Sequence, residues 1–379
     1  MIDLTFWMNI PSFYQSDLFR SLIKTNEVRL HVIFTGRIPG ERLRLGWEDD
    51  LSGLEYEFLD PKTPVREAAR KARARRNSVH VVNGLWAGKQ VLAVLFNLYM
   101  LRSRYLIYSE APDPASSPGP LKKPLTRLLG APLVRNAAAL LPISHFAADF
   151  FRSYGASEDR LFPFAYFREV PDDSSRMGER SIDDRIHLLF AGQLVRRKGL
   201  DILMEAVGSL KESGTNLQLH LVGSGDEESS LRKSVSEMNL GDTVHFEGAL
   251  PPGRIIERLS RADLLVLPSR WDGWGLVVNE AFMAGTPVMV SDSCGAADLV
   301  KEGANGYIFK SNDPSDLRKK LAEFIGAVGQ REKMKLAAIE TGKALRPANA
   351  AEYLVRILKG ESVESVSQSQ KYPWIYKDK

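Results

Sequence analysis

Short apolar runs and longer amphipathic stretches alternate along the chain. The apolar runs are rich in Val, Ile, Leu and aromatic residues, a composition typical of parallel strands buried on both faces. In the first half they predict strands at 2–8, 28–35, 78–83, 104–108 and 139–143. Segments with helical spacing, among them 15–24 and 90–101, lie between these strands.

The alternation restarts more regularly after a polar stretch without periodicity, 170–184, which has the composition of a linker. The second half predicts strands at 186–190, 217–222, 243–246, 263–267, 287–290 and 306–309. It predicts helices at 200–210, 227–238, 254–261, 276–283 and 314–325, and a final one at 348–358. Whether the aromatic residues beyond it, Tyr372, Trp374 and Tyr376, dock or stay exposed is open.

Repeated strand–helix units predict doubly wound parallel sheets of the Rossmann-like α/β class. We therefore expect an N-terminal domain at 1–169, a linker at 170–184 and a C-terminal domain at 185–346, with 347–379 returning to complete the first domain. Ligands of open α/β sheets bind at the carboxyl ends of the strands. Two such domains are expected to face each other across a cleft.

The bulk composition is that of an ordinary globular protein. The length of 379 residues favours two domains. The chain has 44% hydrophobic and 26% charged residues, as soluble globular proteins do. The net charge of +4 is too small to predict nucleic-acid binding. A single cysteine allows no internal disulfide, in agreement with a reducing cytoplasm, and we identify neither a signal peptide nor an apolar run of membrane-spanning length.

Basic residues gather in two segments of the first half. The first is Ala-rich and predicted helical, and the second mixes basic residues with leucines; together they contain Arg66, Arg70, Lys71, Arg73, Arg75, Arg76, Lys122, Lys123, Arg127 and Arg135. A solvated helix face explains this pattern as well as the alternative does. The alternative is a surface for anionic lipid headgroups on the inner face of the cell membrane.

Two segments after predicted strands suit a phosphorylated ligand. The segment 191–201, A-G-Q-L-V-R-R-K-G-L-D, brings cations to the end of a strand, where they could neutralise a diphosphate. The segment 221–226, L-V-G-S-G-D, has glycines that permit close backbone approach. By itself, the first segment is equally typical of an ordinary strand–helix loop, and the second is a weaker signal, because such loops are common in any α/β fold.

The segment 270–292, R-W-D-G-W-G-L-V-V-N-E-A-F-M-A-G-T-P-V-M-V-S-D, has the strongest chemical pattern. Asp272 and Glu280 bracket a glycine-rich turn that opens a predicted helix, and unpaired N–H groups at such a helix start bind phosphate. A buried carboxylate needs a polar partner, and a ribose diol is a suitable one for Glu280. Simple capping or solvation of the helix by both acids is the alternative that we weigh as the minor one.

These motifs resemble the retaining GT-B glycosyltransferases of glycosyltransferase family four, of the bacterial surface-polysaccharide type. The resemblance rests on A-G-Q-L-V-R-R-K-G, L-V-G-S-G, V-H-F-E-G, the Asp272 to Glu280 block with E-A-F-M-A-G-T-P-V, and N-G-Y-I-F, in the family's order over residues 186 to 310. The first half resembles the family in layout, with M-N-I-P-S-F-Y-Q-S-D-L-F-R at 8–20 like the family's openings.

The resemblance implies a donor site for a UDP- or GDP-linked sugar, with no cofactor and no metal. Glu280 is expected to hold the ribose, Asp272 the donor sugar, and Lys198 the diphosphate, and these three are the expected catalytic residues. The rest of the expected donor site comprises Gly192, Gln193, Arg196, Arg197, Gly223, Gly248, Ala249, Gly273, Trp274, Gly275, Leu276 and Val277. The acceptor is expected against the first domain, at Asn9, Ser12, Tyr14, Gln15, Trp86 and Glu110.

Three positions depart from the family pattern. Gln193 stands where the family usually has arginine, so Arg196 or Arg197 is expected to substitute. Asn9-Ile10-Pro11-Ser12 stands in place of a Gly-Gly loop, and Glu110 replaces a histidine.

The resemblance predicts sugar transfer to a hydroxyl of a glycan or lipid-linked acceptor in bacterial polysaccharide or glycolipid biosynthesis. A non-catalytic nucleotide-sugar-binding or partner-binding subunit on the same fold is the alternative. A sugar-nucleotide epimerase is a third possibility. A nicotinamide dehydrogenase is disfavoured, because no G-x-G-x-x-G follows the first predicted strand.

Overall fold

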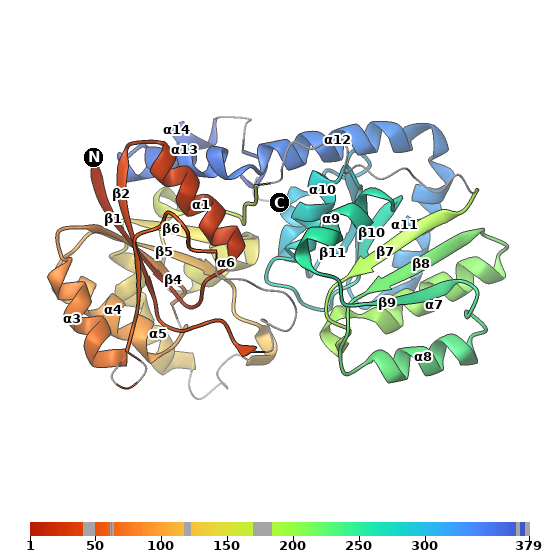
Figure 1. The fold of residues 1–379 in the computed structure, drawn as a ribbon, viewed down its shortest axis with the longest axis horizontal. Helices are drawn as coiled ribbons and strands as arrows, with labels where there is room; N and C mark the ends of the chain where they lie inside the picture. Colours follow the sequence, from red (N-terminus) through yellow and green to blue (C-terminus); the bar gives the residue numbers. More distant parts are fainter. Residues whose placement is uncertain are drawn as a thin grey trace. The chain divides into compact units, whose positions relative to one another are not determined.

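The chain folds into two compact α/β units, each built on a parallel sheet with helices on its faces (Figure 1). The computed structural model describes residues 1–40, 50–60, 62, 64–85, 87–116, 123–169, 184–368 and 372–375. The first unit combines 1–169 with 345–379, and the second comprises 170–344. Most of the predicted linker, residues 170–183, lies outside the described residues.

The first unit has a six-stranded parallel sheet in the order β3-β2-β1-β4-β5-β6. Its strands are β1 Ile2–Met8, β2 Val28–Phe34, β3 Tyr56–Phe58, β4 Val79–Asn83, β5 Tyr105–Glu110 and β6 Ala139–Ile143. Its helices are α1 Phe13–Lys24, α3 Pro64–Ala74, α4 Lys89–Met100, α5 Lys123–Arg135, α6 His145–Ser153, α13 Pro347–Leu358 and α14 Val363–Ser367. The order reverses between β1 and β4, as in a doubly wound sheet.

One face of this sheet is covered by α3, α4 and α5. The buried cluster on that face joins Trp7, Val82 and Ile107 of the strands to alanines of α3, to a Val–Leu stripe of α4 and to Leu133 and Val134 of α5. The stripe of α4 has helical spacing, and its members are Val91, Val94, Leu95 and Leu98. The three helices therefore form the outer layer of the first unit on this side.

The C-terminal segment packs on the first unit. α13 lies against α1, and Lys359 Nζ donates to Glu27 Oε1 at 2.8 Å. Trp374 is buried, and its ring centroid lies 4.7 Å from that of Phe167. Tyr372 is buried as well, so docking is the outcome for these two aromatic residues, whereas Tyr376 lies outside the described residues.

The second unit has a six-stranded parallel sheet in the order β12-β11-β10-β7-β8-β9. Its strands are β7 Ile186–Ala191, β8 Leu217–Val222, β9 Val244–Gly248, β10 Leu264–Leu267, β11 Val288–Ser291 and β12 Gly306–Phe309. Its helices are α7 Leu200–Glu212, α8 Glu228–Glu237, α9 Pro252–Ser260, α10 Val277–Met283, α11 Pro314–Gly326 and α12 Arg331–Ala344. Among the described helices of both units, none is long and apolar enough to cross a membrane.

The predicted doubly wound α/β class is confirmed for both halves. Most predicted elements match within one or two residues; for example, 217–222 and 306–309 coincide with β8 and β12. The sequence prediction missed β3, an edge strand of three residues that are exposed or half-buried. So short and exposed a strand shows too little apolar patterning to be recognised.

Candidate active site

The predicted donor residues gather at one edge of the second sheet. Because all six strands are parallel, the loops after β7, β8, β9 and β10 leave the sheet at its carboxyl edge. The register sets Ala191 beside Val222, and Val222 beside Gly248. Residues 192–198, Gly223, 248–249 and 272–277 therefore share this edge.

Glycines at the edge let neighbouring loops touch. Gly223, at φ +143°, donates its N–H to Gly248 O at 2.8 Å, and Gly192 donates to Val222 O at 2.9 Å. A Cβ on Gly223 would lie 1.8 Å from Gly192 O, and one on Gly225 would lie 2.3 Å from Leu194 O. The sequence suggested that these glycines admit a ligand, but their first role is to let two loops pack backbone to backbone.

Lys198 and Asp272 form an ion pair at this edge. The Lys198 ammonium donates to Asp272 Oδ2, and the two side chains are 11% and 13% exposed. Gly199, which follows the short 3-10 turn Arg196–Lys198, has φ +66°, and a Cβ there would lie 2.1 Å from Pro268 O. The loop that carries Lys198 thus lies directly against the segment that leads to Asp272.

Arg270 fixes the same two segments together, and the sequence analysis missed it. Its guanidinium makes two hydrogen bonds to the Asp201 carboxylate, at 2.8 and 2.7 Å, and a third to Arg196 O at 2.9 Å. These hydrogen bonds raise the pKa of Arg270 and lower that of Asp201. Arg196 and Arg197 themselves have exposed side chains, as does Gln193.

Buried hydrogen bonds of Trp274 stabilise the turn after Asp272. The Trp274 indole is 2% exposed and donates to Asn279 Oδ1 at 2.8 Å. The Cys294 thiol donates to Trp274 O at 2.9 Å, and burial followed by the charge of Asp272 raises the pKa of this thiol. Trp274 therefore shapes the loop from the core side, whereas Asp272 and Gly273 just before it are half-buried.

Glu280 lies in the first turn of α10 and is 5% exposed. α10 packs against α12, where Gly342 allows close contact, because a Cβ there would lie 2.7 Å from Phe282 O. Leu276 and Val277, at the start of α10, are half-buried. The carboxylate of Glu280 is thus nearly enclosed, on a helix that α12 supports from behind.

The predicted base-binding residues, Gly248 and Ala249, are exposed at the end of β9. The preceding residue, Glu247, accepts hydrogen bonds from His220 at 2.8 Å and from Arg258 at 2.7 Å. Burial opposes ionisation of Glu247, but these partners outweigh it and lower its pKa to about 2. The network ties β9 to β8 and α9 just before the exposed loop.

The described acceptor candidates of the first unit lie at the carboxyl edge of its own sheet, after β1 and at the end of β5, two strands that β4 separates. Asn9 is exposed and Ser12 half-buried, and Asn9 Oδ1 accepts the Ile10 N–H at 2.8 Å. Tyr14 and Gln15 are buried. Trp86 lies outside the described residues.

Glu110 is paired with a tyrosine that the sequence analysis did not single out. The Tyr166 hydroxyl donates to Glu110 Oε1 at 2.5 Å, and burial, followed by the charge of Glu110, raises the Tyr166 pKa well above its ordinary value. Arg168 lies over the Phe13 ring at 4.7 Å and near Tyr14. These contacts join segments distant in sequence, which no local pattern could have revealed.

Among the described residues, no group of three or more His, Cys, Asp and Glu side chains is arranged to hold a metal ion. The described cations at the edge of the second sheet are lysine and arginine side chains. The site therefore combines a buried ion pair, an enclosed carboxylate and a rim of exposed arginines.

Residues 172–341, which include every candidate donor residue, match the family described as glycosyl transferases group 1. The second unit of the chain thus matches this family over nearly its whole length.

Curated relatives of this chain match it over part of their length. Alpha-D-kanosaminyltransferase of Streptomyces kanamyceticus is 26% identical over 246 residues, which are 62% of this chain and 63% of the relative. The putative colanic acid biosynthesis glycosyltransferase WcaL of Salmonella typhimurium is 27% identical over 201 residues, 51% of this chain and 48% of the relative. The chain thus spans about half to under two thirds of these relatives.

Solved structures share the fold over nearly all of the chain. Anabaena HepE, in complex with UDP, has a TM-score of 0.74 at 15% identity and covers 95% of this chain and 100% of HepE. The HepE complex with UDP and glucose has a TM-score of 0.72 at 15% identity, with the same coverage. The likeness extends the GT-B fold to the first unit, which the family match does not reach.

Proposed function

We propose that this protein is a retaining, metal-independent glycosyltransferase that moves a sugar from a UDP- or GDP-linked donor to a hydroxyl of a glycan or lipid-linked acceptor. The observation that carries the proposal is the Lys198–Asp272 ion pair together with the enclosed Glu280 of α10, all inside the stretch that matches the family. The HepE structures contain UDP, and UDP with glucose, which supports a nucleoside diphosphate donor.

In this proposal each group at the edge has one donor part to bind. Glu280 accepts hydrogen bonds from the ribose diol, and Asp272 holds hydroxyls of the donor sugar together with N–H groups around Gly273, Trp274 and Gly275. Lys198 and the N–H groups of Leu276 and Val277 bind the diphosphate, and Gly192 gives it room. The exposed loop at Gly248 and Ala249 borders the base.

The exposed arginines complete the phosphate site. Arg196 or Arg197 supplies the positive charge that Gln193 lacks, because both are exposed on the loop that Arg270 holds at the sheet edge. Gly223, although committed to loop packing, keeps this edge narrow enough for backbone to approach the diphosphate.

The reaction follows from that placement. The bond between the anomeric carbon and the diphosphate oxygen breaks, and a bond from the acceptor oxygen to the anomeric carbon forms on the same face. The acceptor proton passes to the departing phosphate, so no protein nucleophile is needed. Lys198 and an arginine stabilise the charge that develops on the leaving diphosphate.

The acceptor would lie against the carboxyl edge of the first unit, near Asn9, Ser12, Tyr14, Gln15, Trp86 and Glu110. We place the protein in the cytoplasm, at the inner face of the cell membrane, in bacterial polysaccharide or glycolipid biosynthesis. The similarity to WcaL, a putative colanic acid biosynthesis glycosyltransferase, supports the polysaccharide role.

A donor panel tests the proposal. Nucleotide-sugars are first ranked by thermal shift, because a bound ligand stabilises the folded state by mass action. The best donor is then incubated with candidate acceptors, with and without EDTA, and nucleoside diphosphate release and the anomeric proton coupling of the product are measured. We expect release that EDTA leaves unchanged and a product with the donor's anomeric configuration.

Other outcomes would assign another function. Tight donor binding without any turnover would favour a non-catalytic nucleotide-sugar-binding subunit. Conversion of the nucleotide-sugar itself, without an acceptor, would favour an epimerase.

A further inference from the structure

The outer helix layer of the first unit exposes large apolar side chains. On α5, Leu125, Leu128 and Leu129 are 58%, 71% and 59% exposed. On α4, Phe96 and Met100 are 57% and 63% exposed. The leucines follow helical i, i+3, i+4 spacing, and the α4 pair follows i, i+4, so each helix presents a stripe to solvent.

The core does not account for these stripes. α4 already fills the core with a separate face, Val91 to Leu98, and α5 enters it through Leu133 and Val134 near its C-terminal end. The first half of α5 therefore stands on the surface with three exposed leucines. Isolated exposed leucines are ordinary, but a stripe of them on a monomer marks an interaction surface.

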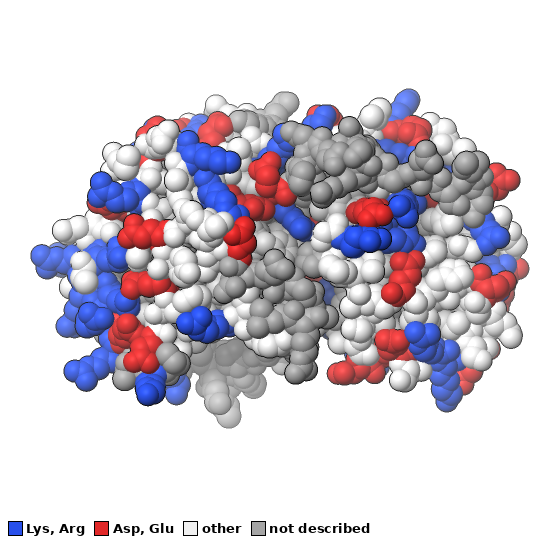
Figure 2. Space-filling view, in the orientation of Figure 1, with Lys and Arg blue, Asp and Glu red and all other residues white. Residues whose placement is uncertain are grey.

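Arginines border the apolar stripes. The exposed arginines Arg66, Arg70, Arg73 and Arg76 belong to α3 and the turn that follows it. α4 packs against both α3 and α5, and Arg73 Nε donates to Asn97 Oδ1, next to Phe96, at 3.3 Å. Figure 2 shows Lys and Arg side chains crowding the end of the first unit where α3 lies in Figure 1.

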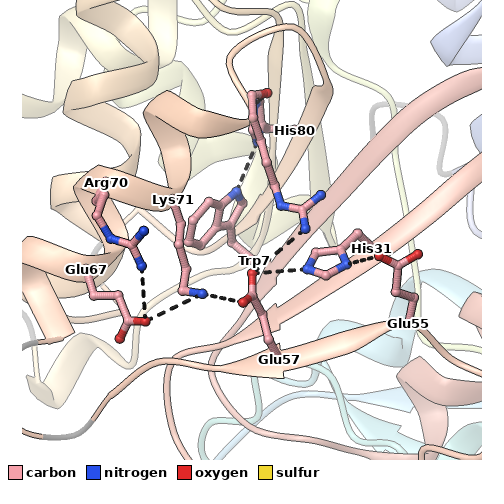
Figure 3. A network of polar contacts seen from close by, with 9 residues as sticks. Trp7, His31, Glu55, Glu57, Glu67, Arg70, Lys71 and His80 are labelled. Carbon is pink, nitrogen blue, oxygen red and sulfur yellow. Dashed lines mark hydrogen bonds and ion pairs between the residues drawn. The ribbon is translucent and has the colours of Figure 1, made fainter.

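Lys71 of α3 and Arg75, just after it, instead lie near a carboxylate of the sheet. Figure 3 shows Lys71 and His31 converging on Glu57 of β3, and Arg75 Nη2 lies 4.0 Å from the same carboxylate. Burial works against the charged form of Glu57, yet the hydrogen bonds from Lys71 and His31 outweigh it and lower its pKa. The ion pair of Lys71 thus fixes α3 to the sheet, and the exposed arginines of α3 and the following turn remain as a net positive surface.

We propose that the α3–α5 layer docks on an anionic lipid surface, with the leucines of α5 and the Phe96–Met100 stripe entering the headgroup boundary and the α3 arginines contacting lipid phosphates. The apolar residues suit the acyl boundary of such a surface, and the arginines suit its negatively charged headgroups. A second copy of this chain fits less well, because a symmetric contact would bring the two arginine rows together.

The docking would serve the proposed function, on which this step rests. In a βα unit the helix begins at the carboxyl edge of the sheet, so the exposed leucines near the start of α5 lie on the same side of the first unit as Asn9 and Glu110. A lipid-linked acceptor would therefore be presented at the edge where the acceptor candidates lie.

Vesicle sedimentation tests the docking. The full chain is mixed with vesicles of phosphatidylcholine alone, or of phosphatidylcholine with phosphatidylglycerol, at low ionic strength and near 1 M salt, where the Debye length falls to about 3 Å. Two variants are compared: Leu125→Ser/Leu128→Ser/Leu129→Ser and Arg66→Gln/Arg70→Gln. Leu336→Ser and Lys233→Gln, at 63% and 77% exposed positions of the second unit, are matched controls.

We expect the wild type to bind the anionic vesicles, with binding reduced by salt, and not the phosphatidylcholine vesicles. The triple leucine variant should bind at least about tenfold more weakly and the double arginine variant about tenfold more weakly, while the controls bind as the wild type. Nucleoside diphosphate release measured with a water-soluble acceptor should be equal in all five proteins, so failure of docking is distinguishable from failure of the transferase.

Absence of wild-type binding to anionic vesicles, or equal binding by the triple leucine variant, would overturn the proposal. A wild-type dimer in light scattering that the leucine substitutions dissociate, without vesicle binding, would assign the face to a second copy. Equal binding to neutral and anionic vesicles would remove the role of the arginines.

Discussion

Lys198 has two partners in the proposed site, the Asp272 carboxylate and the donor diphosphate. Its ammonium is nearly enclosed and contacts Asp272 directly. A buried ammonium is costly without a negative partner, and the Asp272 carboxylate supplies that partner and holds the Lys198 side chain in place. A diphosphate arriving beside it adds negative charge next to a preformed cation, which is the arrangement that stabilises a leaving group.

Replacing Lys198 by alanine should weaken nucleoside diphosphate binding by about 10- to 100-fold, the loss expected for charge-assisted hydrogen bonds worth about 1.5–3 kcal/mol. Calorimetric titration with UDP and GDP measures the effect. Lys233→Ala, which removes an exposed lysine of the same unit, should leave the affinity unchanged. Equal affinity in Lys198→Ala and the wild type would remove Lys198 from the diphosphate site.

Residues that the sequence analysis selected in the second unit lie together at one sheet edge, but the contacts that hold them there were not predictable. Local motifs indicated Lys198, Asp272 and Glu280 because glycines and strand ends flank them. Arg270 and Asp201 pair across 69 positions, and no sequence pattern relates them. The burial of Trp274, whose indole donates to Asn279, is likewise a result of tertiary packing.

Helix α10 owes its position to α12. Gly342 of α12 lies so close to α10 that a Cβ would be 2.7 Å from Met283 N and Phe282 O. The sequence predicted α10 to within one residue, because its apolar pattern follows a strand and a glycine-rich turn. It did not predict α12, whose apolar and polar residues are poorly segregated, nor its contact with the helix that carries Glu280.

Gly342→Ala should destabilise the protein, whereas replacing a glycine within a helix by alanine usually stabilises it. Alanine normally stabilises a helix by about 0.5–1 kcal/mol relative to glycine, and Gly326→Ala in α11, where nothing lies within 4 Å, should follow that rule or be neutral. Gly342→Ala should instead lower the free energy of unfolding by about 1–3 kcal/mol and weaken donor binding. Urea unfolding measures the stability of the two variants, and calorimetry measures their donor affinity. If Gly342→Ala and Gly326→Ala change both quantities equally, α12 does not set the position of α10.

Strand β9 ends in a charge network whose stability depends on pH. The pKa of Glu247 is about 2 in the folded protein, against an ordinary value of 4.5. Because the folded value is the lower one, the carboxylate contributes stability above about pH 4.5, and this contribution is lost as the pH falls towards 2.

Glu247→Gln should therefore lower the free energy of unfolding by roughly 1–2 kcal/mol at neutral pH, a value discounted for the partial exposure of the carboxylate. The gap to the wild type should narrow between pH 4.5 and pH 3 in urea unfolding. A gap that stays constant over this range would mean that the His220 and Arg258 contacts add no net stabilisation to the charged form.

The chain passes from the first unit to the second near residue 170 and returns near residue 345. Its end then packs on the first unit through α13, Tyr372 and Trp374. The return was expected from the sequence as the completion of the first domain, but the docking of the aromatic residues required the structure. In the proposed function the second unit holds the nucleotide and the first holds the acceptor.

Donor binding should accordingly slow amide exchange most strongly in the second unit. We expect the greatest slowing, measured by hydrogen exchange and mass spectrometry with a saturating nucleoside diphosphate, in peptides that cover 192–199 and 272–283. Peptides from α3 to α5 should exchange at unchanged rates. Slower amide exchange confined to the first unit would indicate that the nucleotide binds there, which would contradict the proposed donor site.

The most direct test of sugar transfer at this site is the kcat/KM for nucleoside diphosphate release in three proteins: the wild type, Glu280→Gln, and Glu237→Gln as a control at a 63% exposed glutamate of the same unit. The glutamine variant keeps the volume of Glu280 but loses the charge that holds the ribose diol. We predict a fall of about 10- to 100-fold for Glu280→Gln and no change for Glu237→Gln. Wild-type turnover that Glu280→Gln leaves intact, or no turnover with any donor, would contradict the assignment.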